Sequence, residues 1–343
     1  MNKKQFQYFI GIDIAAQTFA ASIFVDPETP VLTQENFENT TQGFFEFEHW
    51  LNEQHVSKQN SLFCLEACGI YSEAFAHYFY AAEYTVCLEH ALKVKKAFKL
   101  SEHKTDAVDS KQIAEYAFRF TDQLLSWQPR SAIMEKIQHI VTAREQFIKQ
   151  RTALQNELTA YKRHIVQVKL IITTHEKHIK DLTKSIKLLE KELTKMIDHD
   201  DTIRHQTLLL KSAPGFGLLL STVMLITQHQ LGESVSYKTI SSYLGLCPFK
   251  YESGTSVKKR AKSRGYGPSI ARKLLRLAAQ SAVTHNEKYR YYYQRKLAEG
   301  KAKALVLNNV ANKMIKVACA LLKNNKPYIQ NYVSINPNNI KVA

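Results

Sequence analysis

The feature that most constrains this fold is a segment without glycine or proline that runs from Ile133 to Ile197. Within it, apolar residues recur every seven positions in two series offset by three or four residues. The first series is Ile165, Ile172, Ile179, Ile186 and Leu193, and the second is Tyr161, Val168, Leu182, Leu189 and Met196, with His175 filling its gap. The pattern predicts a long helix with the a/d seam of a coiled coil, formed by folding back as a hairpin or by pairing with another chain.

This segment divides the 343 residues into three predicted regions: an α/β domain over 1–128, the coiled coil over 129–200 and a mostly helical domain over 201–343. The first region shows strand and helix patterns in the order β-β-β-α-β-α-β-α. An antiparallel run followed by alternating units predicts a mixed sheet with helices on its faces. In the last region, the sequence LLLKSAPGFGLLLSTVMLI predicts a helix-hairpin-helix-like element, followed by a loop-rich basic stretch and helices near 268–286, 287–299 and 302–324.

Composition narrows the class of partner. Lys and Arg total 47 against 31 acids, a net charge of +16, which favours a polyanion such as nucleic acid. Five cysteines, an odd number without a CxxC pair, argue against a disulfide framework or zinc knuckle and favour the reducing cytoplasm. The apolar stretch 208–226 contains Lys211 and Pro214-Gly215, so we expect no membrane span there.

Four acids occupy positions where a carboxylate is costly to bury or lies close to a second carboxylate. Asp13 interrupts the apolar strand FIGIDIA, and Glu66 ends the apolar strand in FCLEAC. Asp106 and Asp109 are three residues apart on one face of a predicted helix start. If the first and fourth strands are neighbours, Asp13 and Glu66 converge, and the helix brings the aspartate pair to the same place.

Four clustered carboxylates repel one another, and hard divalent cations relieve that repulsion. Two Mg²⁺ ions about 4 Å apart suit phosphodiester chemistry. Each acid taken singly has a simpler explanation: Asp106 compensates a helix dipole, and Asp13 occupies a turn or bulge. The four together, in this strand order, favour the metal site.

A second candidate region lies in the basic stretch. Between Tyr251 and Arg276 there are eight Lys or Arg against one acid, and Ser253-Gly254 precedes the basic run. A serine among cations can attack a phosphate while the cations stabilise the developing charge, although most loop serines do no such thing. In APGFG, Gly215 and Gly217 either let backbone N–H groups approach a phosphate or simply make a tight turn. The candidates for nucleic-acid contact are Lys104, Gly215, Gly217, Lys258, Lys259, Arg260, Lys262, Arg264, Arg272 and Arg276.

The phrases GIDIA, LEACGIYS and KTDAVDSKQIA, with the spacing D…E…DxxD, resemble the DEDD transposases of bacterial insertion sequences, and the SG motif with its basic stretch resembles their second domain. The resemblance spans nearly the whole chain. It implies a ribonuclease-H-like, RuvC-like first domain with catalytic metal ligands at Asp13, Glu66, Asp106 and Asp109. It also implies a nucleophile at Ser253 that links covalently to DNA. Pro268 departs from the asparagine of many relatives.

The family resemblance further implies partners. Its members are bridge-RNA-guided recombinases related to pilin-gene invertases, and they assemble as dimers and tetramers around donor and target DNA duplexes. We therefore expect DNA, a structured guide RNA and further copies of the chain as partners, in the cytoplasm and at the nucleoid when acting.

Three alternatives stay open on the residues alone. One is a Holliday-junction-type metal nuclease that uses water instead of Ser253, and another is an invertase without guide RNA. The third is a binding scaffold, against which Asp13 and Glu66 argue because a scaffold gains nothing from buried acids. The tyrosines Tyr289, Tyr291, Tyr292 and Tyr293 suit base stacking or helix packing, of which we prefer packing.

Overall fold

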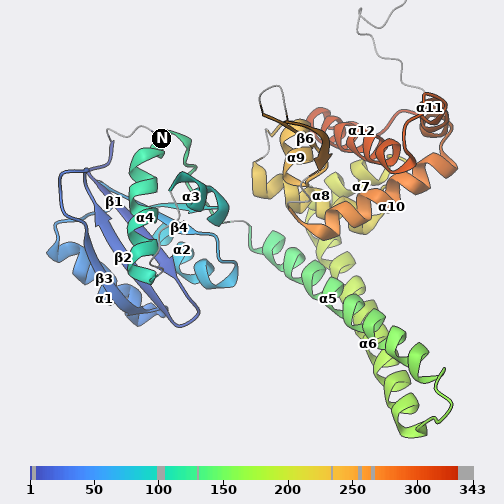
Figure 1. Cartoon of the computed structure of the whole chain (residues 1–343), viewed down its shortest axis with the longest axis horizontal. Helices are drawn as coiled ribbons and strands as arrows, with labels where there is room; N and C mark the ends of the chain where they lie inside the picture. The colour runs from blue at the N-terminus through green and yellow to red at the C-terminus, as the bar shows by residue number, and fades with distance from the viewer. Residues whose placement is uncertain are drawn as a thin grey trace, which may run out of the picture. The chain divides into compact units, whose positions relative to one another are not determined.

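The computed structural model describes residues 1, 5–98, 105–129, 131–232, 235–253, 257–263 and 267–330. The chain forms two compact units, Met1–Pro129 and Arg130–Ala343. Figure 1 draws both, and each is described here by itself. The helical region predicted over 129–200 falls within the second unit, so its standing as a separate domain stays a prediction.

The first unit is a five-stranded mixed sheet covered by helices (Figure 1). Its strands are β1 (Tyr8–Ile14), β2 (Thr18–Phe24), β3 (Leu32–Glu38), β4 (Ser61–Glu66) and β5 (Thr85–Glu89). The order across the sheet is β3-β2-β1-β4-β5, with β1 antiparallel to β2 and parallel to β4. The predicted mixed sheet and the neighbouring first and fourth strands are therefore confirmed.

Alternation along the strands sends side chains to two cores. On one face, α1 (Thr41–Glu53) and α2 (Ile70–Ala81) pack with Ile10 and Ile12 in an aromatic-rich cluster. On the other face, α4 (Asp106–Arg119) and the unpredicted short helix α3 (Ala91–Ala97) pack with Phe9, Leu62 and Cys64. Since the period of a strand is two residues, Asp13 belongs to the same face as Phe9.

The long helix expected over 133–197 is broken. It forms α5 (Ala132–Tyr161) and α6 (Lys169–His199), which pack along each other as an antiparallel hairpin (Figure 1). The heptad residues Ile186 and Leu193 are buried, whereas Ile165 and Val168 lie outside the helices and are exposed. The folded-back alternative thus holds within this chain, and ion pairs such as Arg144–Glu190 join the two helices.

Around the base of this hairpin, six helices and a two-stranded sheet complete the described part of the second unit. The elements are α7 (Asp201–Lys211), α8 (Leu218–Leu231), α9 (Tyr237–Tyr243), β6 (Pro248–Ser253), β7 (Val257–Ser263), α10 (Ser269–His285), α11 (Glu287–Ala298) and α12 (Lys303–Asn324). The loop expected across the basic stretch is in part the antiparallel pair β6–β7, a correction to the prediction. By length and composition α12 alone among the described helices is apolar enough to span a membrane, but Val310, Met314 and Ile315 place it in the protein core.

Candidate active site

Two of the predicted acids lie at the same edge of the first sheet. The parallel pairing of β1 and β4 ends at Ile12 and Leu65, and Asp13 and Glu66 are the next residue on each strand. Both are half-buried. Glu66 shares the strand face of Leu62 and Cys64, which pack against α4, as Asp13 shares the face of Phe9. The two carboxylates therefore emerge side by side under α4.

The direction of α4 decides where the aspartate pair lies. A Cβ on Gly11 would be 2.2 Å from the Ala114 nitrogen and from the Ser110 oxygen, so the helix backbone rests directly on β1 at this glycine. The ring of Phe9 is 5.3 Å from that of Phe118, so α4 runs antiparallel to β1. Two strand residues beyond Gly11 advance about 6.6 Å, or about four helical residues. Asp13 is therefore level with the first turn of α4.

That first turn carries the aspartate pair. Asp106 and Asp109 follow the N-cap Thr105, whose hydroxyl accepts a hydrogen bond from the Val108 nitrogen. Asp109 is half-buried and Asp106 is exposed. The next residue, Ser110, is buried and hydrogen-bonds to Ser22 of β2 at 2.8 Å, which fixes the helix start against the sheet. The structure thus brings all four acids to one end of the sheet.

The pKa of the Cys68 thiol reflects the negative charge at this end of the sheet. Burial raises its pKa, and the carboxylates of Glu66 and Asp13 raise it further, while Lys95 of α3 opposes them. Both carboxylates therefore lie within electrostatic range of one sulfur atom. The Cys68 loop contains Gly69 at φ +67°, which turns the chain from β4 into α2.

A fifth acid on this face was missed by the sequence analysis. Glu89 ends β5, pairs in register with Glu66 and is 7% exposed. It forms an ion pair with Lys93 at 3.0 Å and accepts a hydrogen bond from Tyr116 of α4 at 3.4 Å. The signal was present, because the tripeptide CLE ends both β4 and β5.

The donor set of the four predicted acids fits a hard divalent cation. Within the described residues, the carboxylates of Glu66, Asp106 and Asp109 have no hydrogen-bond or ion-pair partner, whereas Glu89 has its lysine. Among the described residues, no three of the four acids have carboxylate oxygens within 4.8 Å of one another, so the end of the sheet offers oxygen ligands without a closed metal cage. Carboxylates without a protein cation favour an oxygen-seeking metal ion at this end of the sheet.

Ser253 lies at the end of a strand in the second unit. It is the last residue of β6, and it pairs with Val257 at the start of β7. Lys258, Lys259, Arg260 and Lys262 follow along β7, so the hairpin backbone carries the serine and these cations on adjacent strands. Lys104 and Arg264 lie outside the described residues.

The comparisons with known proteins cover both regions. Residues 10–165 match a DEDD-type transposase family represented by IS110, and residues 207–294 match a family described as "Transposase IS116/IS110/IS902 family". The chain belongs to the IS110-type transposases. It is an enzyme of the DNA transposase and recombinase class, and DNA is its partner.

Named relatives agree with this assignment. The transposase is 27% identical to the "Pilin gene-inverting protein" of Moraxella bovis over 327 residues, which are 93% of this chain and 97% of the relative. The protein of the same name from Moraxella lacunata matches equally. An "Insertion element IS110 uncharacterized 43.6 kDa protein" of Streptomyces coelicolor is 32% identical over 122 residues, 35% of this chain and 29% of that protein.

A cationic groove lies at the base of the transposase's β6–β7 hairpin. Its volume is about 350 Å³, and Arg272, Lys273 and Arg276 of α10 line it. Arg272 donates to the Gly267 carbonyl at 2.8 Å, so it ties α10 to the chain beyond β7, and Lys273 pairs with Glu145 at 3.0 Å. Arg276 is exposed. Of the three cations, Arg276 is best placed to meet a phosphate.

The turn between α7 and α8 contains the two predicted glycines. Gly215 has φ +83°, and a Cβ there would be 2.8 Å from the Ala278 oxygen, so close packing on α10 explains this glycine. Gly217 is the exposed N-cap of α8, with open space around it. A phosphate contact at either glycine stays a prediction.

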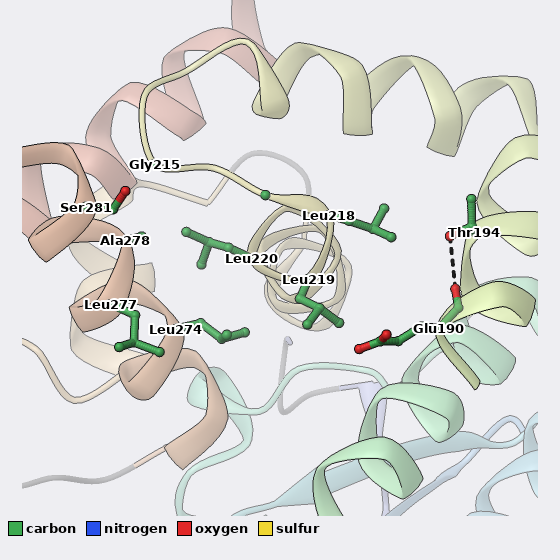
Figure 2. Close-up of a pocket in the computed structure, with 11 residues that line it drawn as sticks. Glu190, Thr194, Gly215, Leu218, Leu219, Leu220, Leu274, Leu277, Ala278 and Ser281 are labelled. Atoms are coloured by element: carbon green, nitrogen blue, oxygen red, sulfur yellow. Dashed lines mark hydrogen bonds between the residues drawn. The ribbon is translucent and has the colours of Figure 1, made fainter. Parts of the chain in front are cut away.

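Figure 2 shows the groove that borders this turn. Its volume is about 600 Å³, and leucines from α8 and α10 line most of it, with Glu190 and Thr194 at the α6 side. Leu277 is 55% exposed. Because leucine side chains and an acid line it, this groove suits apolar groups and does not attract phosphate.

Proposed function

We propose that this transposase cuts and rejoins donor and target DNA through a covalent phosphoserine at Ser253, with Mg²⁺ held by Asp13, Glu66, Asp106 and Asp109. The first unit is then a ribonuclease-H-like, RuvC-like domain. Its strand order, with three antiparallel strands followed by parallel crossovers, supports that assignment. We further propose that a structured guide RNA selects the DNA.

The observation that supports the proposal is the placement of four acids at the same end of the sheet. Strand pairing brings Asp13 and Glu66 together, and the antiparallel course of α4 brings its first turn to the same level. Three of these acids lack a described cation partner. Carboxylates without a protein cation add no stability to the fold, so we infer that their value lies in binding a positive ligand.

The residues take distinct roles in the reaction. The bound divalent ions would supply Lewis-acid stabilisation of the scissile phosphate. The Ser253 oxygen forms a bond to phosphorus and loses its proton, while the bond from phosphorus to the 3′ oxygen breaks and that oxygen gains a proton. The strand end is then held as a phosphoserine ester. A 3′ hydroxyl from the other duplex reverses the attack, which exchanges strands without a net loss of phosphodiester bonds.

Cations on the same hairpin would assist the attack by Ser253. Lys258, Lys259, Arg260 and Lys262 share the hairpin with Ser253, and Arg276 faces the groove at its base. Positive side chains of this kind hold the DNA backbone and stabilise charge that develops on the transferred phosphoryl group.

Assembly follows from the same proposal. Ser253 belongs to the second compact unit and the acids belong to the first. We propose that the α5–α6 hairpin, as a coiled coil, joins protomers into dimers and tetramers, so that serine and carboxylates of different protomers are able to act on one phosphate.

A second candidate is a site-specific invertase that needs no guide RNA. The observation that favours it is the match to the two Moraxella pilin gene-inverting proteins over 93% of this chain. The strand chemistry is the same in both candidates, and only the means of choosing the site differs.

A covalent-adduct experiment tests the proposal. The transposase is purified from cells carrying its own locus, mixed with Mg²⁺ and locus DNA, denatured, and digested for mass spectrometry. We expect a DNA-linked peptide at Ser253 that disappears with EDTA, with Ser253→Ala and with Glu66→Gln. RNase treatment before the reaction separates the two candidates, since only a guided enzyme loses the adduct.

The matched control is Ser263→Ala at the far end of the same hairpin. It should leave the adduct intact. Cleavage without any adduct, at an equal rate in Ser253→Ala, would contradict the serine chemistry and leave a metal nuclease.

A further inference from the structure

Three helices of the second unit gather cations around two tyrosine rings. The Lys313 ammonium of α12 is 4.3 Å from the centre of the Tyr292 ring of α11, and the Arg295 guanidinium is 5.7 Å from the same ring. The Lys316 ammonium is 5.6 Å from the ring of Tyr237 in α9. Helix α12 packs against both α9 and α11, so these contacts join into one surface.

We call this surface the α11–α12 cationic ridge, and define it by Arg295, Lys296, Lys313 and Lys316. Arg295, Lys313 and Lys316 are exposed. Burial lowers the pKa of Lys313, and the charges of Arg295, Lys316 and Lys296 lower it further. Lys313 is therefore close enough to the other three cations to be repelled by them.

Only part of this charge is neutralised by the described residues. Glu299 at the end of α11 is 2.7 Å from Lys296, 3.4 Å from Lys301 and 4.0 Å from Arg295. Lys313 and Lys316 have no ion-pair partner among the described residues. Lys313 and Lys316 on α12 therefore carry two positive charges that no acid among the described residues neutralises.

Tyr289 and Tyr292 are engaged within the protein, whereas Tyr291 is 66% exposed. Burial raises the pKa of Tyr289 to about 12, and its side chain is 8% exposed, which supports helix packing. Tyr292 is half-buried and contacts both Lys313 and Arg295. Cation–π contacts restrict the ammonium groups, so they lose less conformational freedom when a ligand binds.

We propose that the α11–α12 cationic ridge is a binding site for the phosphate backbone of nucleic acid. A polyanion relieves the repulsion that the other cations exert on Lys313, and it is recognised by charge alone, without base contacts. The ridge shares no residue with the groove of Arg272 and Arg276 or with the β6–β7 hairpin, so it extends the contact beyond the region of Ser253.

The test measures equilibrium binding of Lys313→Gln/Lys316→Gln as a function of salt. The probes are a mixed-sequence DNA duplex and a mixed-sequence single-stranded RNA, with EDTA present so that the result is independent of the metal-dependent strand chemistry. Losing two phosphate contacts reduces the slope of log Kobs against log salt by about 1.8 for the duplex and about 1.4 for the RNA. At roughly 0.15 M salt this weakens binding on the order of 30-fold for the duplex and about 10-fold for the RNA.

The matched control is Lys187→Gln/Lys191→Gln on α6, where both lysines are exposed and the change in net charge is the same. Glutamine and lysine have similar helix propensities, so neither variant should unfold its helix, and circular dichroism checks this. Lys313→Arg/Lys316→Arg should keep the wild-type slope. A reduced slope with either probe, absent in the control, supports the site and identifies the nucleic acid. An unchanged slope with both probes, or an equal reduction in the control, overturns it.

Discussion

Strands β4 and β5 both end in a glutamate, but the two glutamates differ in their partners. Glu66 and Glu89 each follow a Cys-Leu pair, stand in register on neighbouring strands and face α4. Glu89 is buried and paired with Lys93 and Tyr116, whereas Glu66 has no such partner among the described residues. One carboxylate is therefore satisfied by the protein, and the other, next to Asp13, is left for a ligand. The partner of a buried acid, more than its position in a strand, separates a structural role from a functional one.

The largest expected difference between the two is in activity. Glu66→Gln removes a charged ligand from the proposed metal site, and we expect DNA strand cleavage to fall by roughly 10³-fold, about 4 kcal/mol of transition-state stabilisation. Glu89→Gln should retain most of the activity at temperatures where it is folded. Single-turnover cleavage of locus DNA in Mg²⁺ measures both. Equal losses in the two variants would contradict the division between them.

For stability, we expect Glu89→Gln to have the larger effect and Glu66→Gln the smaller one. Glu89→Gln removes the ion pair with Lys93 and weakens the hydrogen bond from Tyr116, so we expect the free energy of unfolding to fall by about 1–2 kcal/mol. Glu66→Gln relieves repulsion from Asp13 and should leave stability unchanged or slightly raised. Urea titrations of both variants without divalent ions give the values. A destabilised Glu66→Gln protein would mean that Glu66 has a structural partner after all.

Titration of Tyr116 at alkaline pH also distinguishes the role of Glu89 from that of Glu66. Burial raises the pKa of Tyr116 to about 12, and the charge and hydrogen bond of Glu89 contribute to the rise. A phenol whose pKa is higher in the folded state contributes stability that is present below about pH 10 and is lost as the pH rises through 12. Glu89→Gln should lower the pKa of Tyr116, and Glu66→Gln should not move it. Absorbance of the tyrosinate, measured as the difference from Tyr116→Phe, follows the titration.

The sequence pointed to Asp13 and Glu66 for one physical reason. An ionisable residue at the end of an apolar strand costs free energy unless it has a partner, and this marked Asp13 and Glu66. The same reasoning applies to Glu89, whose stabilisation by Lys93 depends on the unpredicted helix α3. Local pattern identifies an acid that needs a partner, and only the fold shows whether the protein supplies one.

Two other features of the fold could not be predicted from sequence patterns. The turn between α5 and α6 contains neither glycine nor proline, and its closure includes a hydrogen bond from the Gln167 amide to the Lys162 carbonyl at 2.9 Å. Strand β7, VKKRAKS, lacks apolar alternation and is rich in lysine, which is depleted in strands, so its pairing with β6 is carried by the backbone.

The smallest expected difference is in the reactivity of Cys68. Its thiol pKa is raised by burial and then by Glu66 and Asp13, whereas Glu89 does not contribute. Glu66→Gln should therefore lower that pKa and increase the thiolate fraction, which speeds alkylation by iodoacetamide about threefold near pH 8, while Glu89→Gln should leave the rate unchanged. Mass spectrometry of the Cys68 peptide measures the rate, because Cys64 and Cys87 are buried. If Glu89→Gln accelerates the reaction equally, the gain reflects a loosened sheet edge and not the loss of one charge beside the thiol.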